Sequence, residues 1–138
     1  LRRLRDDGTA GPRPVLVVED DPASREVIRR ALERDGWLVR EANNGREAFT
    51  LREEEAPDLV VLDLMMPVMD GFEFVSRLRR SDSGQRIPVV VVTAKELTAK
   101  DRERLGGSVS RVFHKGSFTR EELIGELRNA LEAGRRRS

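Results

Sequence analysis

Residues 59–63 read Leu-Val-Val-Leu-Asp, a continuous apolar run that ends in a carboxylate. Residues 15–19 (Val-Leu-Val-Val-Glu) and 88–93 (Pro-Val-Val-Val-Val-Thr) repeat the same pattern. A strand without alternating polar residues is covered on both faces, which is typical of a parallel sheet. We therefore predict three buried parallel strands, a fourth at 111–115, and a weaker, alternating edge strand at 37–41.

Helical periodicity separates the predicted strands. Helices are predicted over five segments: 24–34, 44–55, 72–80, 97–105 and 119–133. The first of these would bury one face, formed by Val27, Ile28, Ala31 and Leu32. Strand and helix therefore alternate five times over residues 14–133, which predicts a doubly wound α/β domain of the (βα)5 type.

Capping residues place the ends of two helices. Asp21 precedes Pro22, a cap followed by proline in the first turn, and Gly36 follows the same helix. Thr119 and Glu122 have the spacing of a capping box, in which each side chain bonds the other residue's backbone N–H.

The composition excludes several kinds of site. The 138 residues include no cysteine and one histidine, so disulfides, cysteine-ligated zinc and thiol catalysis are excluded. A histidine-based site would depend on His114 alone. No apolar run approaches the roughly 18–20 residues of a membrane span, so we expect a cytoplasmic domain with no membrane partner.

Both ends of the chain are basic. The formal net charge is +1, with residues 1–14 at +2, residues 134–138 at +3 and the stretch between them at −4. We interpret 1–13 as a linker or leader, 14–133 as the domain and 134–138 as a basic tail. A short arginine run is most simply a solvated end, so no direct nucleic-acid partner is expected.

Polar side chains follow each central strand directly. The first strand delivers Glu19 and Asp20, the next central strand Asp63, and the last two Thr93 and Lys115. Sites in open parallel sheets form beyond the carboxyl ends of the strands. Converging carboxylates repel one another, and a hard divalent cation such as Mg²⁺ relieves that repulsion. With a lysine and a hydroxyl nearby, the set predicts a phosphoryl-receiving site in which a carboxylate attacks.

Each of these residues also has an ordinary explanation. A lone aspartate after a strand is usually a helix cap, a threonine there is a turn residue, and a lysine is solvated. The prediction therefore depends on their meeting at one edge of the sheet.

Four blocks of the chain carry a family resemblance: 15–22, 58–71, 89–94 and 113–116. The second reads Asp-Leu-Val-Val-Leu-Asp-Leu-Met-Met-Pro-Val-Met-Asp-Gly and is the most specific. Over residues 14–133 the sequence resembles the receiver domain of two-component response regulators. The resemblance implies a flavodoxin-like five-stranded parallel sheet of order 2-1-3-4-5.

The resemblance also implies a metal site. Glu19 and Asp20 correspond to the acidic pair of the family, and Asp20 and Asp63 would bind Mg²⁺ directly. Glu19 would act mainly through water, and the backbone carbonyl of Met65 would be the third protein ligand. Asp21 is expected to cap the first helix instead.

The remaining roles concern the phosphoryl group. The resemblance makes Asp63 the phospho-acceptor, Thr93 the switch hydroxyl that moves onto the phosphoryl group, and Lys115 the lysine that holds it. Met65 and Lys95, each two residues beyond a site residue, would flank the group and tune its hydrolysis.

The implied function is a phosphorylation-controlled switch in a bacterial phosphorelay. The phosphodonor would be a histidine kinase or phosphotransfer domain, and the chain would catalyse only its own phosphorylation and slow dephosphorylation. The surface of residues 97–105, 111–115 and 119–133 would then contact a downstream protein, and a homodimer is left open. We expect the receiver to belong to a larger protein of the hybrid-kinase type.

The sequence departs from the family at two positions. Gly116 stands where most receivers have a proline after the lysine, and glycine supplies unusual dihedrals without a cis bond. Val112 stands where receivers usually carry the aromatic ring that moves with the threonine. Phe113 is expected on the opposite face of the strand and His114 at its surface end.

Three alternatives were weighed against this interpretation. A degenerate receiver used only for docking stays open because of Val112. A Mg²⁺-dependent aspartyl phosphatase usually has a second aspartate where this chain has Met65. A flavodoxin-like cofactor binder needs a loop that accepts phosphate after the first strand, and Glu19-Asp20-Asp21 would repel one.

Overall fold

Five parallel strands form the centre of the molecule in a computed structural model that describes residues 14–66, 68–81, 84 and 86–136. The strands are β1 (Val15–Val18), β2 (Val39–Ala42), β3 (Leu59–Leu62), β4 (Val89–Thr93) and β5 (Arg111–His114). Their order across the sheet is β2-β1-β3-β4-β5, and neighbouring strands pair in parallel. The predicted (βα)5 sheet and its 2-1-3-4-5 order are confirmed.

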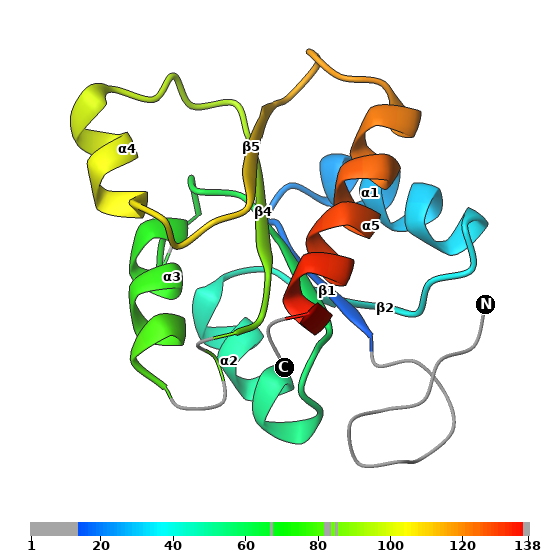
Figure 1. Cartoon of the computed structure of the whole chain (residues 1–138), viewed down its shortest axis with the longest axis horizontal. Helices are drawn as coiled ribbons and strands as arrows, with labels where there is room; N and C mark the ends of the chain where they lie inside the picture. Colours follow the sequence, from blue (N-terminus) through cyan, green and yellow to red (C-terminus); the bar gives the residue numbers. More distant parts are fainter. Residues whose placement is uncertain (1–13, 67, 82–83, 85, 137–138) are drawn as a thin grey trace.

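Helices cover both faces of this sheet, as Figure 1 shows. They are α1 (Pro22–Arg34), α2 (Gly45–Glu54), α3 (Gly71–Arg80), α4 (Ala99–Leu105) and α5 (Arg120–Arg136). Two hydrophobic clusters follow from this arrangement, one under α2, α3 and α4 and the other under α1 and α5. The helices therefore cover both faces of the central strands β1, β3 and β4, which are fully buried, whereas the outer strands β2 and β5 are only partly buried.

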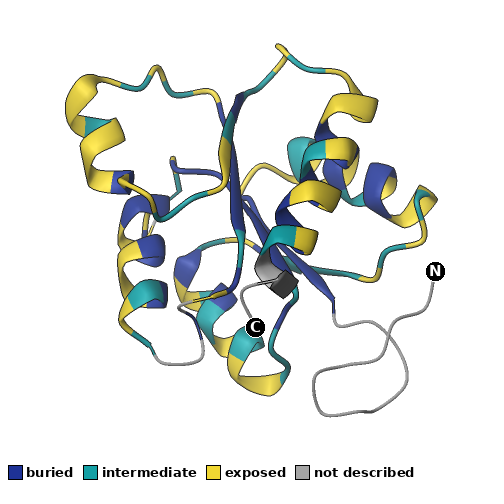
Figure 2. Ribbon diagram, in the orientation of Figure 1, coloured by how far each residue is buried: buried dark blue, intermediate teal, exposed yellow. Residues whose placement is uncertain are grey.

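Alternate residues of the central strands serve the two clusters. In β3, Val60 and Leu62 belong to the first cluster, and Leu59 and Val61 belong to the second. All four residues of β3 are buried, as are those of β1 and β4 (Figure 2). The valine-rich runs are continuous in the sequence because both faces of each strand lie in a core.

One prediction about helix packing was wrong. Val27 was expected on the buried face of α1, but it is 70% exposed, whereas Ile28, Ala31 and Leu32 are buried. Successive residues are rotated by about 100° around a helix axis. Val27 therefore faces away from the sheet when Ile28 packs against it.

The helix ends follow the predicted caps. The Asp21 carboxylate accepts the Ser24 N–H at the start of α1. Ahead of α5, the Glu122 N–H donates to Thr119 Oγ1 and the Thr119 N–H donates to Glu122 Oε1, at 3.1 and 2.8 Å. Helix α5 continues to Arg136, into the segment that was expected to be a basic tail. The expected leader, 1–13, lies outside the described residues.

In the part of the chain that the structure describes, no helix combines the length and apolar character needed to cross a bilayer.

Gly71 allows α3 to approach β3 closely. A Cβ atom at this position would lie 2.6 Å from both the Asp63 carbonyl oxygen and the Leu64 Cα atom. We expect Gly71→Ala to lower the free energy of unfolding by about 1–3 kcal/mol, because backbone atoms must shift to make room.

Gly125→Ala in α5 is the matched control, because a Cβ there meets nothing within 4 Å. This change should raise stability by about 0.5–1 kcal/mol through the lower entropy of the unfolded chain. Urea unfolding of both variants measures the difference. Equal effects of the two changes would contradict the close approach at Gly71.

Candidate functional site

The predicted site residues meet at the carboxyl end of the sheet because the strand pairing continues one residue past each strand. The Glu19 N–H donates to the Ala42 carbonyl at 3.0 Å. The Asp63 N–H donates to Val18 at 3.0 Å, and the Lys115 N–H donates to Thr93 at 2.9 Å. The backbone hydrogen bonds of the sheet therefore hold these residues in place independently of their side-chain contacts.

Three carboxylates gather at this edge. Glu19, Asp20 and Asp63 each offer an oxygen atom, and these oxygens all lie within 4.8 Å of one another. Glu19 and Asp63 are only 2% and 5% exposed, whereas Asp20 is open to solvent. A set made only of carboxylate oxygens, with one open side, fits a hard divalent cation that keeps several waters.

Lys115 balances the two buried carboxylates. Its Nζ atom lies 2.5 Å from Glu19 Oε1 and 3.3 Å from Asp63 Oδ2. Burial by itself would lower the pKa of Lys115, but the hydrogen bond to Glu19 and the charge of Asp63 outweigh it and raise that pKa. The ammonium group therefore stays charged beside the carboxylates.

The Glu19 carboxyl group is almost fully buried beside the charge of Asp63. Burial raises the pKa of Glu19 to about 7, against the opposing hydrogen bonds from Lys115 and the Asp21 N–H. The neighbouring charge of Asp63 adds to the increase. At neutral pH this carboxyl group is therefore poised to gain or lose a proton as the local charge changes.

Asp63 and Met65 form a tight turn after β3. The Met65 N–H donates to Asp63 Oδ1 at 3.2 Å, which orients the carboxylate from its own chain. The Met65 side chain is 57% exposed. With Asp20 and Lys95 it lines an open hollow of about 560 Å³ beside the carboxylates.

Thr93 is fully buried at the end of β4. Its Oγ1 atom accepts the Lys95 N–H at 3.2 Å, and the Lys95 ammonium lies 3.4 Å from Asp101 Oδ2 in the first turn of α4. The hydroxyl is thus connected to α4 through the loop that follows it.

Strand β5 confirms the expected alternation. Val112 packs against the cluster under α2, α3 and α4, whereas Phe113 belongs to the other cluster, and its ring lies tilted against that of Phe118 with 5.0 Å between the ring centroids. The position of the usual aromatic ring is therefore held by a half-buried valine. His114 is half-buried, and Gly116 has φ of +82°, a conformation that glycine adopts without strain.

One contact of the site was not predicted from the sequence. Arg25, in α1, donates from Nη1 to the Glu19 carbonyl oxygen at 2.9 Å. Its other partners, Glu41 and Asn43, are far away in the chain. Alpha-helical periodicity marks Arg25 only as a polar residue beside the buried face, so no local pattern could have identified the contact.

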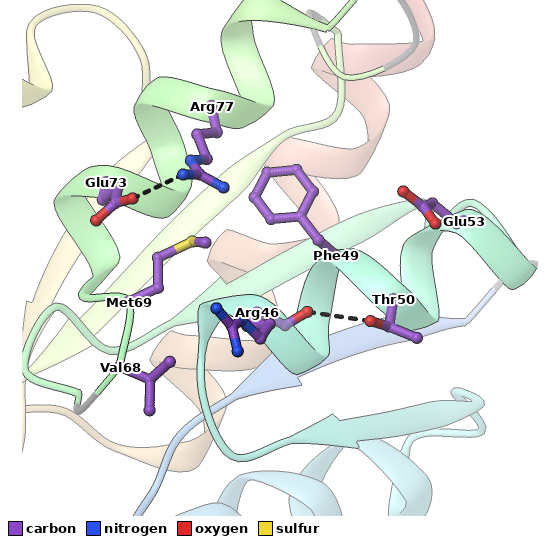
Figure 3. Close-up of a pocket in the computed structure, with 8 residues that line it drawn as sticks. All are labelled: Arg46, Phe49, Thr50, Glu53, Val68, Met69, Glu73 and Arg77. Atoms are coloured by element: carbon purple, nitrogen blue, oxygen red, sulfur yellow. Dashed lines mark hydrogen bonds and ion pairs between the residues drawn. The ribbon is translucent and has the colours of Figure 1, made fainter.

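A second hollow, of about 240 Å³, lies between α2 and α3 (Figure 3). Arg46 and Phe49 line it from α2, and Glu73 and Arg77 form an ion pair along α3 at 3.2 Å. None of the clustered carboxylates lines it, so this hollow is separate from the site.

Comparison with known proteins gives consistent matches. A family model described as the response regulator receiver domain matches residues 15–128. The chain is 39% identical to Response regulator MprA of Mycolicibacterium vanbaalenii over 120 residues, covering 87% of this chain and 51% of that protein. The chain therefore spans about half the length of the MprA relatives that it matches.

Solved structures of this shape include two receivers. The chemotaxis protein CheY4 of Vibrio cholerae superposes with a TM-score of 0.79 and 27% identity, covering 87% of this chain and 99% of that one. The receiver domain of sensor histidine kinase PA1611 from Pseudomonas aeruginosa gives a TM-score of 0.78 and 29% identity, covering 88% and 99%. That receiver was solved with a magnesium ion coordinated in its active-site cleft.

The raised pKa of Glu19 predicts how stability depends on pH without divalent metal. Unfolded, the carboxyl titrates near 4.5, but folded it holds its proton to about 7. Folding thus takes up a proton between these values, and stability falls as pH rises through this window. We expect a contribution of about 1 kcal/mol per pH unit.

Urea unfolding in EDTA at pH 5, 6 and 7 measures this slope, with Glu19→Gln as the comparison. The variant has no carboxyl to titrate at this position, so its stability should change less with pH than that of the parent. Parallel curves for the two proteins would contradict the raised pKa.

Proposed function

This chain belongs to the response regulator receiver domain family, and on that premise we propose that it is a signalling switch operated by phosphorylation of Asp63. One observation carries the proposal. A buried carboxylate lies beside two others and within 3.3 Å of a lysine ammonium, at the open edge of the sheet. Such a carboxylate can act as the nucleophile. The lysine and the other two carboxylates beside it can bind a phosphoryl group, directly or through a metal ion.

The proposed reaction is a transfer from a phosphohistidine. A carboxylate oxygen of Asp63 forms a bond to phosphorus while the donor's phosphorus–nitrogen bond breaks, and the leaving imidazole takes the electron pair. The donor is a histidine kinase or a phosphotransfer domain. We place the exchange in the bacterial cytoplasm, where ATP is available to the kinase.

The carboxylates of Glu19, Asp20 and Asp63 and the backbone carbonyl of Met65 would hold Mg²⁺, with Glu19 acting mainly through water. The ion would supply positive charge that neutralises the incoming phosphoryl oxygens. The Lys115 ammonium would bind the same oxygens. Because Lys115 contacts both Glu19 and Asp63 before the reaction, its charge is already in place.

The switch step uses the buried hydroxyl of Thr93. When this hydroxyl turns to the phosphoryl group, its bond from the Lys95 N–H is lost. The Lys95 side chain contacts Asp101, which forms the capping box of α4 with Thr98. We propose that the change reaches α4 along this path, since Val112 offers no ring to carry it.

The output surface is then formed by α4, β5 and α5. Strand β5 is the edge of the sheet, and α4 is mostly exposed apart from Leu105. This surface would meet a downstream protein or a second copy of the chain. Attachment to a larger protein of the hybrid-kinase type is also part of the proposal, supported by the likeness to the receiver of a sensor histidine kinase.

Phosphorylation itself is the first test. Incubation with Mg²⁺ and acetyl phosphate should add one phosphoryl group to the parent chain, because Asp63 is the only predicted acceptor. Intact-mass measurement should show no addition for Asp63→Asn, and none for the parent in EDTA.

Asp35→Asn is the matched control, since Asp35 pairs with Arg128 and has no contact with the site. This variant should be phosphorylated like the parent. Failure with acetyl phosphate and also with a phosphorylated histidine donor would refute the switch and leave a docking module.

The lifetime of the phosphorylated form should depend on Met65. An exposed thioether at the mouth of the site obstructs water and offers it no strong hydrogen bond. Met65→Asn places an amide there that can orient an attacking water, a gain of about 1 kcal/mol or roughly a fivefold faster loss of phosphate. Intact mass followed over time after removal of the donor gives the rate.

Val68→Asn is the control for this change, because Val68 is the other strongly exposed apolar residue described in the same loop. Its decay rate should match that of the parent. An unchanged rate for Met65→Asn would remove Met65 from the hydrolysis step.

A further inference from the structure

We propose that Arg25 is a positioning residue that sets the direction of the Asp20 carboxylate and so controls the affinity for Mg²⁺. The inference rests on the proposed function, in which Asp20 binds the ion. It goes further, because it assigns a role to a residue outside the carboxylate cluster.

Arg25 contacts the backbone of the acidic segment. Nη1 of Arg25 donates to the Glu19 carbonyl oxygen at 2.9 Å. That oxygen belongs to the planar peptide group that joins Glu19 to Asp20. A bond that holds this oxygen therefore also holds the Asp20 Cα atom in position. Asp20 needs this support, because its carboxylate has no hydrogen-bond or ion-pair partner within the described residues.

The Arg25 side chain is itself held in place by contacts with β2 and the loop after it. Its Nε atom lies 2.8 Å from Glu41 Oε2, and Nη1 also donates to Asn43 Oδ1 at 2.6 Å. Glu41 belongs to β2 and Asn43 to the loop after it, so the guanidinium is fixed to the neighbouring strand. The side chain is 18% exposed, which leaves it little freedom to move.

The acidic segment also has supports within its own loop. The Asp21 N–H donates to Glu19 Oε2 at 3.1 Å, and the Asp21 carboxylate caps α1. These bonds restrain the residues on either side of Asp20. The bond from Arg25 comes from outside this loop, and it restrains the peptide group between Glu19 and Asp20.

Charge and position predict opposite results when Arg25 is removed. If Arg25 acted only as a positive charge near the site, its loss would strengthen the binding of a cation. If it positions Asp20, its loss weakens binding although no ligand has been removed. The sign of the change therefore separates the two explanations.

The experiment measures the dissociation constant for Mg²⁺ by calorimetric titration of the full chain with MgCl₂. Arg25→Met should raise this constant by about tenfold, in the range seen when residues that orient metal ligands are lost. Arg29→Met is the matched control, because Arg29 pairs with the same Glu41 at 3.2 Å and makes no contact with Glu19. Its constant should stay at the parent value.

Arg25→Lys provides the second variant, which keeps the charge and loses the planar fork that reaches several acceptors at once. It should also bind Mg²⁺ more weakly than the parent, and it decides the question if Arg25→Met does not fold. Parent-like or tighter binding by the folded Arg25 variants would overturn the inference. Absence of Mg²⁺ binding by the parent would instead refute the proposed metal site.

Discussion

The ion pairs that Lys115 makes with Glu19 and Asp63 are the interaction on which the site depends. Two carboxylates almost completely buried at one sheet edge repel each other, and each has lost most of its hydration. The Lys115 ammonium reaches both, at 2.5 and 3.3 Å. The Lys115 ammonium offsets part of this cost, and burial still raises the pKa of Glu19 to about 7.

The parallel sheet makes this concentration of charge tolerable. Backbone bonds from Glu19, Asp63 and Lys115 continue the ladder one residue past the strands, so the charged groups begin from fixed positions. Strands β1, β3 and β4 are buried along their whole length and packed on both faces, which provides a rigid base. A stable core thus supports a strained edge, an arrangement typical of functional sites.

The supports differ between the two sides of the site. Arg25 donates to the Glu19 carbonyl of the acidic loop and also to Glu41 in β2 and Asn43 just after it, and the Asp21 carboxylate caps α1. On the opposite side, Thr93 is connected to α4 through the Lys95 N–H and one partly exposed ion pair between Lys95 and Asp101. Partly exposed ion pairs contribute little to stability, so this is the side where a change of state costs least.

Local patterns were sufficient for the secondary structure and for much of the fold. The valine-rich runs determined the buried strands, and the caps at Asp21 and Thr119 determined helix starts, because these signals act within a few residues. Gathering of the strand-end residues at one edge also followed from parallel strands. The strand order came from family resemblance, and the burial of Val27 was mispredicted because periodicity does not give the exact rotation of a helix.

The side-chain contacts within the site depend on the fold and could not be predicted from the sequence. Lys115 lies far from Glu19 in the chain, and Arg25 of α1 lies far from Glu41 and Asn43. The order and register of the strands bring these side chains together. The pKa of Glu19 likewise depends on how deeply packing buries it. The kind of sheet and the chemistry at the carboxyl ends of its strands could be predicted from the sequence, since both arise from the local hydrophobic pattern and the residue types. The contacts that position and charge the site required the fold, since they join side chains whose separation no local pattern records.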